Sequence, residues 1–275
     1  MSMVRPYYET LNGAISTGDV SMENLNRIKS AGISMIEISC RYDKYFLELN
    51  FPVNAERIAA DAKAAGISIW SIHLPFNRQQ DISMLDDEKR RFIIDANRQL
   101  IEAAGRIGIK VAVLHPSSEP ISDEERPERM RRSREAIIEL NKVAQDCGVM
   151  LAVENLPRTC LCRTAEEMVE LLNGTGAKVV FDTNHSLIQQ NHYFIKTLAE
   201  AGLEIVSLHI SDYDFVNERH LLPGDGLNNW TAIFAALQEA SYQGPMLYEI
   251  SMGVYGMDYA QAGMNMMKLK MGQIR

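Results

Sequence analysis

The sequence lacks the features that would place it in a specialised class of protein. No apolar run in its 275 residues approaches the roughly 20 residues that cross a membrane. The first residues, MSMVRPYYETLNG, lack the apolar core of a secretory signal. The sequence also has no low-complexity segment and no obvious linker. We therefore expect a cytoplasmic protein with no membrane contact.

Cysteine and positive charge are both scarce. The four cysteines are too few and too scattered for a disulfide framework, so we interpret them as reduced thiols. Cys160 and Cys162 have the spacing of half a metal clip, but no second pair accompanies them. The net charge of -8 and the pI near 5.3 argue against a large nucleic-acid surface, which needs clustered Lys and Arg. We expect no nucleic-acid partner.

What is present is ordinary globular composition, 46% hydrophobic and 23% charged, with short apolar runs alternating with segments of helical spacing. The expected strands are 7–11, 34–39, 68–73, 110–115, 149–155, 178–182, 205–208 and 245–250. The expected helices are 21–31, 55–65, 86–107, 123–147, 165–172, 189–201, 229–240 and 258–271. Thr164 is expected to cap the fifth helix, with Glu167 completing a capping box.

This alternation predicts a parallel sheet, and eight units predict closure into a (β/α)8 TIM barrel, one α/β domain over residues 1–275. A doubly wound open sheet is the alternative architecture. No glycine-rich nucleotide fingerprint follows the first strand, which counts against that alternative. Six expected helices run into a glycine, as a left-handed C-terminal cap requires; these are Gly32, Gly66, Gly108, Gly148, Gly202 and Gly244.

Polar, chemically reactive side chains stand at the expected carboxyl ends of six successive strands. In a barrel these ends converge on one mouth. A single His at such a position is more often structural, but three buried carboxylates facing one another would repel, and a divalent cation removes that conflict. The strand-end residues are His73, His115, Glu154, Asp182, His209 and Glu249, with His185 three positions after Asp182.

Four of these residues form a mixed oxygen and nitrogen set that suits one divalent metal ion, Mn, Co, Mg or Zn. The predicted ligands are Glu154, Asp182, His209 and Glu249.

At these residues the chain resembles the xylose-isomerase-like barrel superfamily, which holds sugar and sugar-phosphate isomerases, ketose 3-epimerases and apurinic-site endonucleases. The similar motifs run through most of the chain in the family's order and are more specific for the superfamily than for a substrate. They are SIHLPF (71–76), VLHP (113–116), AVEN (152–155), FDTNH (181–185), LHISD (208–212), RHLLPGDG (219–226) and YEI (248–250).

The resemblance implies a metal-dependent isomerase or epimerase of a ketose, an aldose or a sugar phosphate. It implies that the four predicted ligands match the family's and that Glu154 and Glu249 also carry the proton chemistry. Removing a proton beside a carbonyl leaves an enediolate, whose charge a metal stabilises while a carboxylate takes the proton. The expected partner is a small carbohydrate. The expected substrate contacts are His73, His115, His185, Arg219 and His220.

A multi-zinc phosphodiesterase is the alternative function, because apurinic-site endonucleases use the same barrel for three-metal hydrolysis. The resemblance places their extra ligands at His73, His115 and His185, and at the tripeptide Glu218-Arg219-His220, with Glu218 where an Asp is expected. The net charge of -8 counts against a nuclease, as do the loops HPSSEP and ENLPRT, which are poorer in glycine than the nuclease patterns.

Three further features of the sequence each allow two interpretations. Glu37 ends the second strand, where it either lies behind the metal site or caps a loop. Arg158 and Arg163 follow the fifth strand and either bind a phosphate or pair on the surface. The methionines of the last helix, 258–271, indicate either adaptable packing or a subunit interface, and a homo-oligomer is expected from the resemblance.

Overall fold

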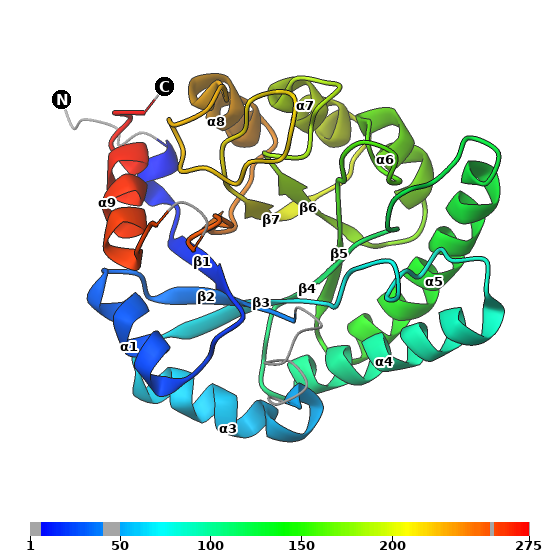
Figure 1. The fold of residues 1–275 in the computed structure, drawn as a ribbon, viewed down its shortest axis with the longest axis horizontal. Helices are drawn as coiled ribbons and strands as arrows, with labels where there is room; N and C mark the ends of the chain where they lie inside the picture. The colour runs from blue at the N-terminus through cyan, green and yellow to red at the C-terminus, as the bar shows by residue number, and fades with distance from the viewer. Residues whose placement is uncertain (1–6, 41–49, 254–255, 275) are drawn as a thin grey trace.

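The protein is a barrel of eight parallel strands surrounded by helices (Figure 1). The computed structural model describes residues 7–40, 50–253 and 256–274. Strands that follow one another in the chain are neighbours in the sheet, and β8 lies beside β1. A parallel bridge between Ile210 and Tyr248, just beyond β7, joins the two edges of the sheet. The prediction of a TIM barrel is therefore confirmed, and the doubly wound sheet is excluded.

Each strand is followed by a helix that packs outside it (Figure 1). The strands are β1 (Gly13–Thr17), β2 (Met35–Ser39), β3 (Ser68–His73), β4 (Val111–Leu114), β5 (Met150–Glu154), β6 (Lys178–Asp182), β7 (Ile205–His209) and β8 (Met246–Tyr248). The helices are α1 (Met22–Ser30), α3 (Phe51–Ala64), α4 (Asp87–Arg106), α5 (Arg126–Asp146), α6 (Ala165–Leu172), α7 (Asn191–Glu200), α8 (Trp230–Glu239) and α9 (Tyr259–Lys270). No helix within the described ranges is long and apolar enough to span a bilayer.

The first predicted strand, 7–11, is wrong. Tyr7–Thr10 forms a short 3-10 helix, η1, and the first strand lies further on, at Gly13–Thr17. The two tyrosines that suggested a strand instead pack near α8. The ring of Tyr8 lies 5.4 Å from that of Phe234, and the hydroxyl of Tyr7 donates to the carbonyl of Tyr242. Aromatic residues favour strands only where a sheet surface receives them, and here a helix does.

The predicted capping box at Thr164 is only half formed. The Thr164 hydroxyl accepts a hydrogen bond from the Glu167 N–H at 3.2 Å, as expected. The Glu167 carboxylate does not return the bond to Thr164. It accepts from the N–H of Arg163 at 3.2 Å and pairs with the guanidinium of Arg126. A stronger, charged partner has drawn the carboxylate away from the cap.

Gly244 was predicted as a helix cap and is not one. After α8 the left-handed position is taken by Ser241, with φ of 56°, and Gly244 does not have a positive φ. A Cβ on Gly244 would lie 2.5 Å from the carbonyl oxygen of Val206, so the glycine is needed for close approach to β7. The other five predicted glycines do have positive φ.

Two apolar layers fix the barrel. Along β4, Ala112 and Leu114 join the large core shared with the helices, whereas Val111 and Val113 point to the opposite face. That inner face packs into a second cluster inside the barrel, with Val111, Val113, Ala152, Val180, Val206, Trp70 and Met150. This packed interior leaves the polar residues at the carboxyl ends of the strands to face the mouth.

Candidate metal and substrate site

Six consecutive strands, β3 to β8, deliver the predicted polar residues to the carboxyl end of the barrel. His73, Glu154, Asp182 and His209 are the last residues of β3, β5, β6 and β7. His115 and Glu249 stand one residue beyond β4 and β8. All are buried except His115, whose side chain is 16% exposed.

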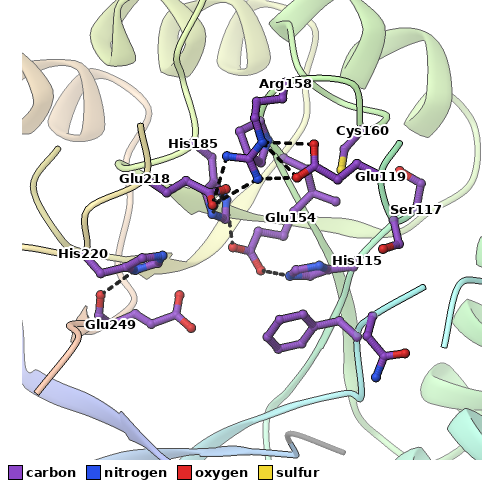
Figure 2. A pocket seen from close by; sticks show the side chains of 15 residues that line it. His115, Ser117, Glu119, Glu154, Arg158, Cys160, His185, Glu218, His220 and Glu249 are labelled. Atoms are coloured by element: carbon purple, nitrogen blue, oxygen red, sulfur yellow. Dashed lines mark hydrogen bonds and ion pairs between the residues drawn. The ribbon is translucent and has the colours of Figure 1, made fainter. Parts of the chain in front are cut away.

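A pocket of about 460 Å³ opens over these residues, a size typical of small-molecule sites. Figure 2 shows its polar side chains pointing inward from several elements, with Glu154 between His115 and His185 and with Glu249 across the cavity. Phe76 supplies an apolar wall, because its ring stacks on that of His115 at 4.3 Å. The pocket therefore combines a few polar groups with an aromatic face, as sugar-sized ligands require.

Glu154 lies at the centre of the site and touches four imidazole rings. Its Oε2 is 3.2 Å from His73 Nε2 and 3.1 Å from His115 Nε2. Its Oε1 is 3.0 Å from His209 Nδ1 and 3.3 Å from His185 Nδ1. Burial raises the pKa of the Glu154 carboxyl, but the histidines, His209 first, outweigh it and hold the pKa well below its usual range.

The His209 ring lies among the other carboxylates. Its Nδ1 is 3.1 Å from Glu249 Oε2 and 3.9 Å from Asp182 Oδ2, in addition to its contact with Glu154. The four predicted metal ligands thus offer atoms that all lie within 4.8 Å of one another. The structure brings together in space the set that the sequence placed on four different strands.

Asp182 shows why a cation fits this set. Its Oδ1 accepts from the N–H of Asn184 at 2.5 Å, but its buried Oδ2 accepts no hydrogen bond from any residue in the described ranges. Burial raises the pKa of Asp182 to about 7, and the nearby Glu154 and Glu249 carboxylates add to the effect against His185. A divalent cation would satisfy the free oxygen and balance the clustered negative charge.

His73 leads to the same conclusion from its hydrogen bonds. Its Nδ1 lies 2.9 Å from the carbonyl oxygen of Leu74, and a carbonyl can only accept, so Nδ1 carries the proton. The other nitrogen of the neutral ring then presents a lone pair to Glu154 Oε2. Two facing lone pairs repel unless a proton or a metal lies between them. Burial lowers the pKa of His73, but Glu154 outweighs burial and raises the pKa, so a proton occupies this position in the metal-free protein and a bound cation would take its place.

Another group of ligand-type residues stands at the rim, namely His185, Glu218 and His220. His185 Nε2 lies 3.4 Å from Glu218 Oε1, and His185 Nδ1 donates to the carbonyl of Asn155 at 2.8 Å. His220 Nδ1 donates to the carbonyl of Glu249 at 3.1 Å, with a left-handed φ of 47°. Burial lowers the pKa of His185, but the Asp182 and Glu154 carboxylates outweigh it and raise the pKa to about 10.

The loop that carries Glu218 and His220 is folded around the buried carboxylate of Asp212. This carboxylate accepts hydrogen bonds from Gly224 N at 2.8 Å, Asn228 N at 2.9 Å and Trp230 Nε1 at 3.1 Å. Buried carboxylates with several donors hold loops in one conformation. Asp212 therefore sets the position of the rim group.

Arg219, predicted as a substrate contact, does not line this pocket. Its side chain is 45% exposed and its Nε lies 3.7 Å from Asp214 Oδ2. Its backbone N–H donates to Asn184 Oδ1 at 3.1 Å. The two residues that flank Arg219, Glu218 and His220, line the pocket instead. From the sequence alone, Glu218 is considered only as a variant nuclease ligand.

Sequence reasoning missed Glu119, which lines the pocket and binds Arg158. Arg158 Nε lies 2.9 and 3.0 Å from the two carboxylate oxygens of Glu119, and its guanidinium also lies 3.2 Å from Glu218 Oε2. Figure 2 shows Arg158 held between these two carboxylates above Glu154. Glu119 lies in the loop after β4, and such loops form the mouth of a barrel, so its position was the available sign.

Residues 25–270 match the family model described as xylose isomerase-like TIM barrel. The L-ribulose-5-phosphate 3-epimerase UlaE of Salmonella paratyphi C is 23% identical over 242 residues, 86% of this chain and 84% of that protein. The D-psicose 3-epimerase of Enterocloster bolteae is 29% identical over 134 residues, 47% of this chain and 42% of the relative.

Among solved structures, a D-tagatose 3-epimerase-like protein superimposes with a TM-score of 0.82 at 20% identity, covering 96% of this chain and 98% of that one. Three of the curated relatives are covered over only 42% to 63% of their own length. The similarity to the solved structure shows the shared fold, and the named relatives are sugar epimerases.

Proposed function

The chain belongs to the xylose isomerase-like TIM barrel family, and from this we propose that it is a metal-dependent isomerase or epimerase of a ketose, an aldose or a sugar phosphate. The observation that carries the proposal is the convergence of two glutamates, an aspartate and a histidine at the floor of a sugar-sized pocket. Relatives that act as sugar epimerases support the reaction class.

One divalent ion, Mn, Co, Mg or Zn, would be held by Glu154, Asp182, His209 and Glu249. When bound, such an ion acts as a Lewis acid that stabilises the negative charge of an enediolate. Asp182 Oδ2 supports this assignment, because it is buried and accepts no hydrogen bond within the part of the chain that the structure describes.

Glu154 and Glu249 are the proposed acid/base pair. The reaction removes a proton from the carbon beside a carbonyl and returns one to the other carbon, or to the other face of the same carbon. The two carboxylates come from β5 and β8, offer oxygens within 4.8 Å of each other and both line the pocket (Figure 2). One takes the proton from the sugar and the other returns it, so a sugar lying between them is reached from two sides.

The histidines around the pair are the proposed contacts to sugar hydroxyls. His115, His185 and His220 line the pocket, and His73 supports Glu154 from below the surface of the cavity. Each ring is held by a contact to Glu154, to a backbone carbonyl or to both, which leaves little freedom of orientation. Fixed donors and acceptors of this kind orient a substrate for proton transfer.

Charge at the mouth favours an uncharged sugar over a sugar phosphate. The Arg158 guanidinium already faces Glu119 and Glu218, and Arg158 lowers the pKa of the Glu119 carboxyl, so that carboxyl is ionised. A phosphate approaching Arg158 would have to displace both carboxylates and would meet their negative charge. Arg163, the other predicted phosphate contact, does not line this pocket.

Solvent deuterium exchange tests the proposal. The metal-loaded protein is incubated in D2O with a panel of ketoses and ketose phosphates, and deuterium in the recovered sugar is measured by mass spectrometry. Proton abstraction labels even a poor substrate, so exchange that requires both the protein and the metal is the expected result. Absence of exchange across the whole panel would remove the isomerase assignment.

A metal-dependent phosphodiesterase is the second candidate. One observation favours this candidate, because further groups of possible ligands adjoin the first. They include His73 with His115 and Glu154, and His185 with Glu218 and His220. Metal analysis of the purified protein separates the two candidates. One ion per chain supports the isomerase, whereas three zinc ions per chain with cleavage of an abasic-site DNA would replace it.

A further inference from the structure

Glu37, on β2, contacts the far side of the His209 ring from inside the barrel. Its Oε1 lies 3.1 Å from His209 Nε2, and both side chains are fully buried. Its other oxygen, Oε2, accepts a hydrogen bond from the hydroxyl of Ser71 on β3 at 2.7 Å. Side chains from the neighbouring strands β2 and β3 thus cross the barrel interior to reach the proposed metal ligand on β7.

Burial of the Glu37 carboxyl group is energetically unfavourable, and the group does not line the substrate pocket. Burying a carboxyl group is unfavourable unless hydrogen bonds or an opposite charge compensate for its lost solvation. Glu37 does not line the pocket, so its role is not to contact the sugar. Within the described ranges, neither Glu37 Oε1 nor His209 Nε2 forms a hydrogen bond, and the 3.1 Å approach between them is a charge contact. The contact between Glu37 Oε1 and His209 Nε2 is therefore the polar contact that the structure gives each of these two atoms.

We propose that Glu37 is a positioning residue that fixes the orientation and the tautomer of His209. The inference rests on the proposed function, since it assumes that His209 binds a metal. Metal binding through Nδ1 requires the imidazole proton to stand on Nε2, where the Glu37 carboxylate, which can only accept, lies 3.1 Å away. Nδ1 then keeps its lone pair and faces Glu154, Asp182 and Glu249. The neutral ring with a free nitrogen is the form that binds a metal.

Ser71 completes the arrangement by holding Glu37 itself. Its hydroxyl fixes the carboxylate oxygen that does not face His209. Ser71 on β3 thereby restricts the Glu37 side chain on β2, and Glu37 in turn restricts the ring of His209 at the end of β7. A residue that only filled space in the barrel would need neither a carboxyl group nor this second hydrogen bond.

Metal affinity tests the inference without relying on turnover. Metal-free wild type, Glu37→Ala, Glu37→Gln and Ser71→Ala are titrated with Co2+, following its visible absorption bands and the heat of binding. Outer-sphere partners of this kind usually change metal affinity by about 10–100-fold. We expect a loss of that order in Glu37→Ala. A smaller loss is expected in Glu37→Gln, whose amide oxygen still accepts from Nε2–H, and in Ser71→Ala. Glu170→Gln, exposed on α6, is the control and should bind as wild type does.

Ring nitrogen NMR supplies an independent measurement. In the Zn2+-loaded wild type, the 15N shifts of His209 should show a proton on Nε2, and this assignment should persist in Glu37→Gln. Wild-type Co2+ affinity in Glu37→Ala would overturn the inference while leaving the metal site intact, whereas a proton on Nδ1 of His209 would overturn the inference and remove His209 from the proposed ligands. If Glu37→Ala does not fold, the inference is tested by the NMR assignment of His209 and by the Co2+ affinity of Glu37→Gln, and wild-type affinity in Glu37→Gln together with a proton on Nδ1 would overturn it. A wild type that binds no divalent metal would overturn both the inference and the proposed function.

Discussion

Asn155 and Asp182 are joined by two hydrogen bonds that cross from the end of β5 to the end of β6. Asn155 Nδ2 donates to the carbonyl of Asp182 at 3.0 Å, and the Asp182 N–H donates to Asn155 Oδ1 at 2.7 Å. Asn155 directly follows Glu154 and is fully buried. The pair therefore sets the spacing of two proposed metal ligands, which neighbouring strands alone would leave less closely defined.

Replacing Asn155 with Ala should weaken both the fold and the site. The change leaves the buried Asp182 N–H without its partner, which costs about 1–3 kcal/mol. We expect the free energy of unfolding of the metal-free protein to fall by that amount and metal affinity to fall with it, measured by urea denaturation and metal titration. Asn173→Ala, at an exposed position after α6, is the control. Unchanged metal affinity in Asn155→Ala would show that the pair does not set the ligand spacing.

Glu154→Gln and Glu249→Gln should each abolish most turnover and leave the fold intact. General acid–base groups contribute about 10²–10⁴-fold to rate, and the amide cannot exchange protons at neutral pH. We expect kcat to fall by that factor, with circular dichroism as for wild type and Glu170→Gln as the exposed control. Metal content must be measured in each variant, because both residues are also proposed ligands. A variant with near full activity would remove that residue from the mechanism.

Metal removal should lower the stability of the wild type more than it lowers the stability of the Asp182→Asn variant. A ligand present at 100 times its dissociation constant stabilises the folded state by about 2.7 kcal/mol. A chelator should therefore lower the melting temperature of wild type clearly, and that of Asp182→Asn little, because the variant has lost one proposed ligand. Equal sensitivity of the two proteins to the chelator would argue against Asp182 as a ligand.

The pH dependence of the metal-free protein should also report on Asp182. Folding raises the pKa of this carboxyl from 3.8 to about 7 by burial. The folded state thus binds the proton more tightly than the unfolded chain, so stability contributed by this group is present at low pH and is lost as pH rises through about 7. Measured between pH 5 and 8 by urea denaturation, the stability of Asp182→Asn relative to wild type should increase with pH. A difference that does not change with pH would contradict the assignment.

The charges around Arg158 should control substrate choice. In the double variant Glu119→Gln, Glu218→Gln the guanidinium loses both charged partners and two negative charges leave the mouth. We expect kcat/KM for a ketose phosphate, relative to the free ketose, to rise by roughly tenfold, which corresponds to about 1.4 kcal/mol. The comparison uses the same two sugars with wild type and with Glu170→Gln. A fall in that ratio would show that the phosphate group of the substrate does not bind at Arg158.

Much of this protein was predictable because its defining features are local. An apolar run that ends in a polar residue marks the end of a strand, and eight such runs separated by helical segments determine a barrel. The pattern therefore places four residues at one mouth from the sequence alone, namely Glu154, Asp182, His209 and Glu249. The error at 7–11 arose because aromatic residues have no local feature that distinguishes a strand from packing against α8.

The sequence by itself determined the barrel, the order of its strands and which residues stand at their ends. Only the tertiary structure decided which nitrogen of each histidine faces which carboxylate, and that Glu37 lies behind His209 while Arg158 lies between Glu119 and Glu218. These contacts join residues far apart in the chain and depend on loop conformations set by other buried groups, such as Asp212. No local pattern encodes them, because each is the result of packing several segments at once.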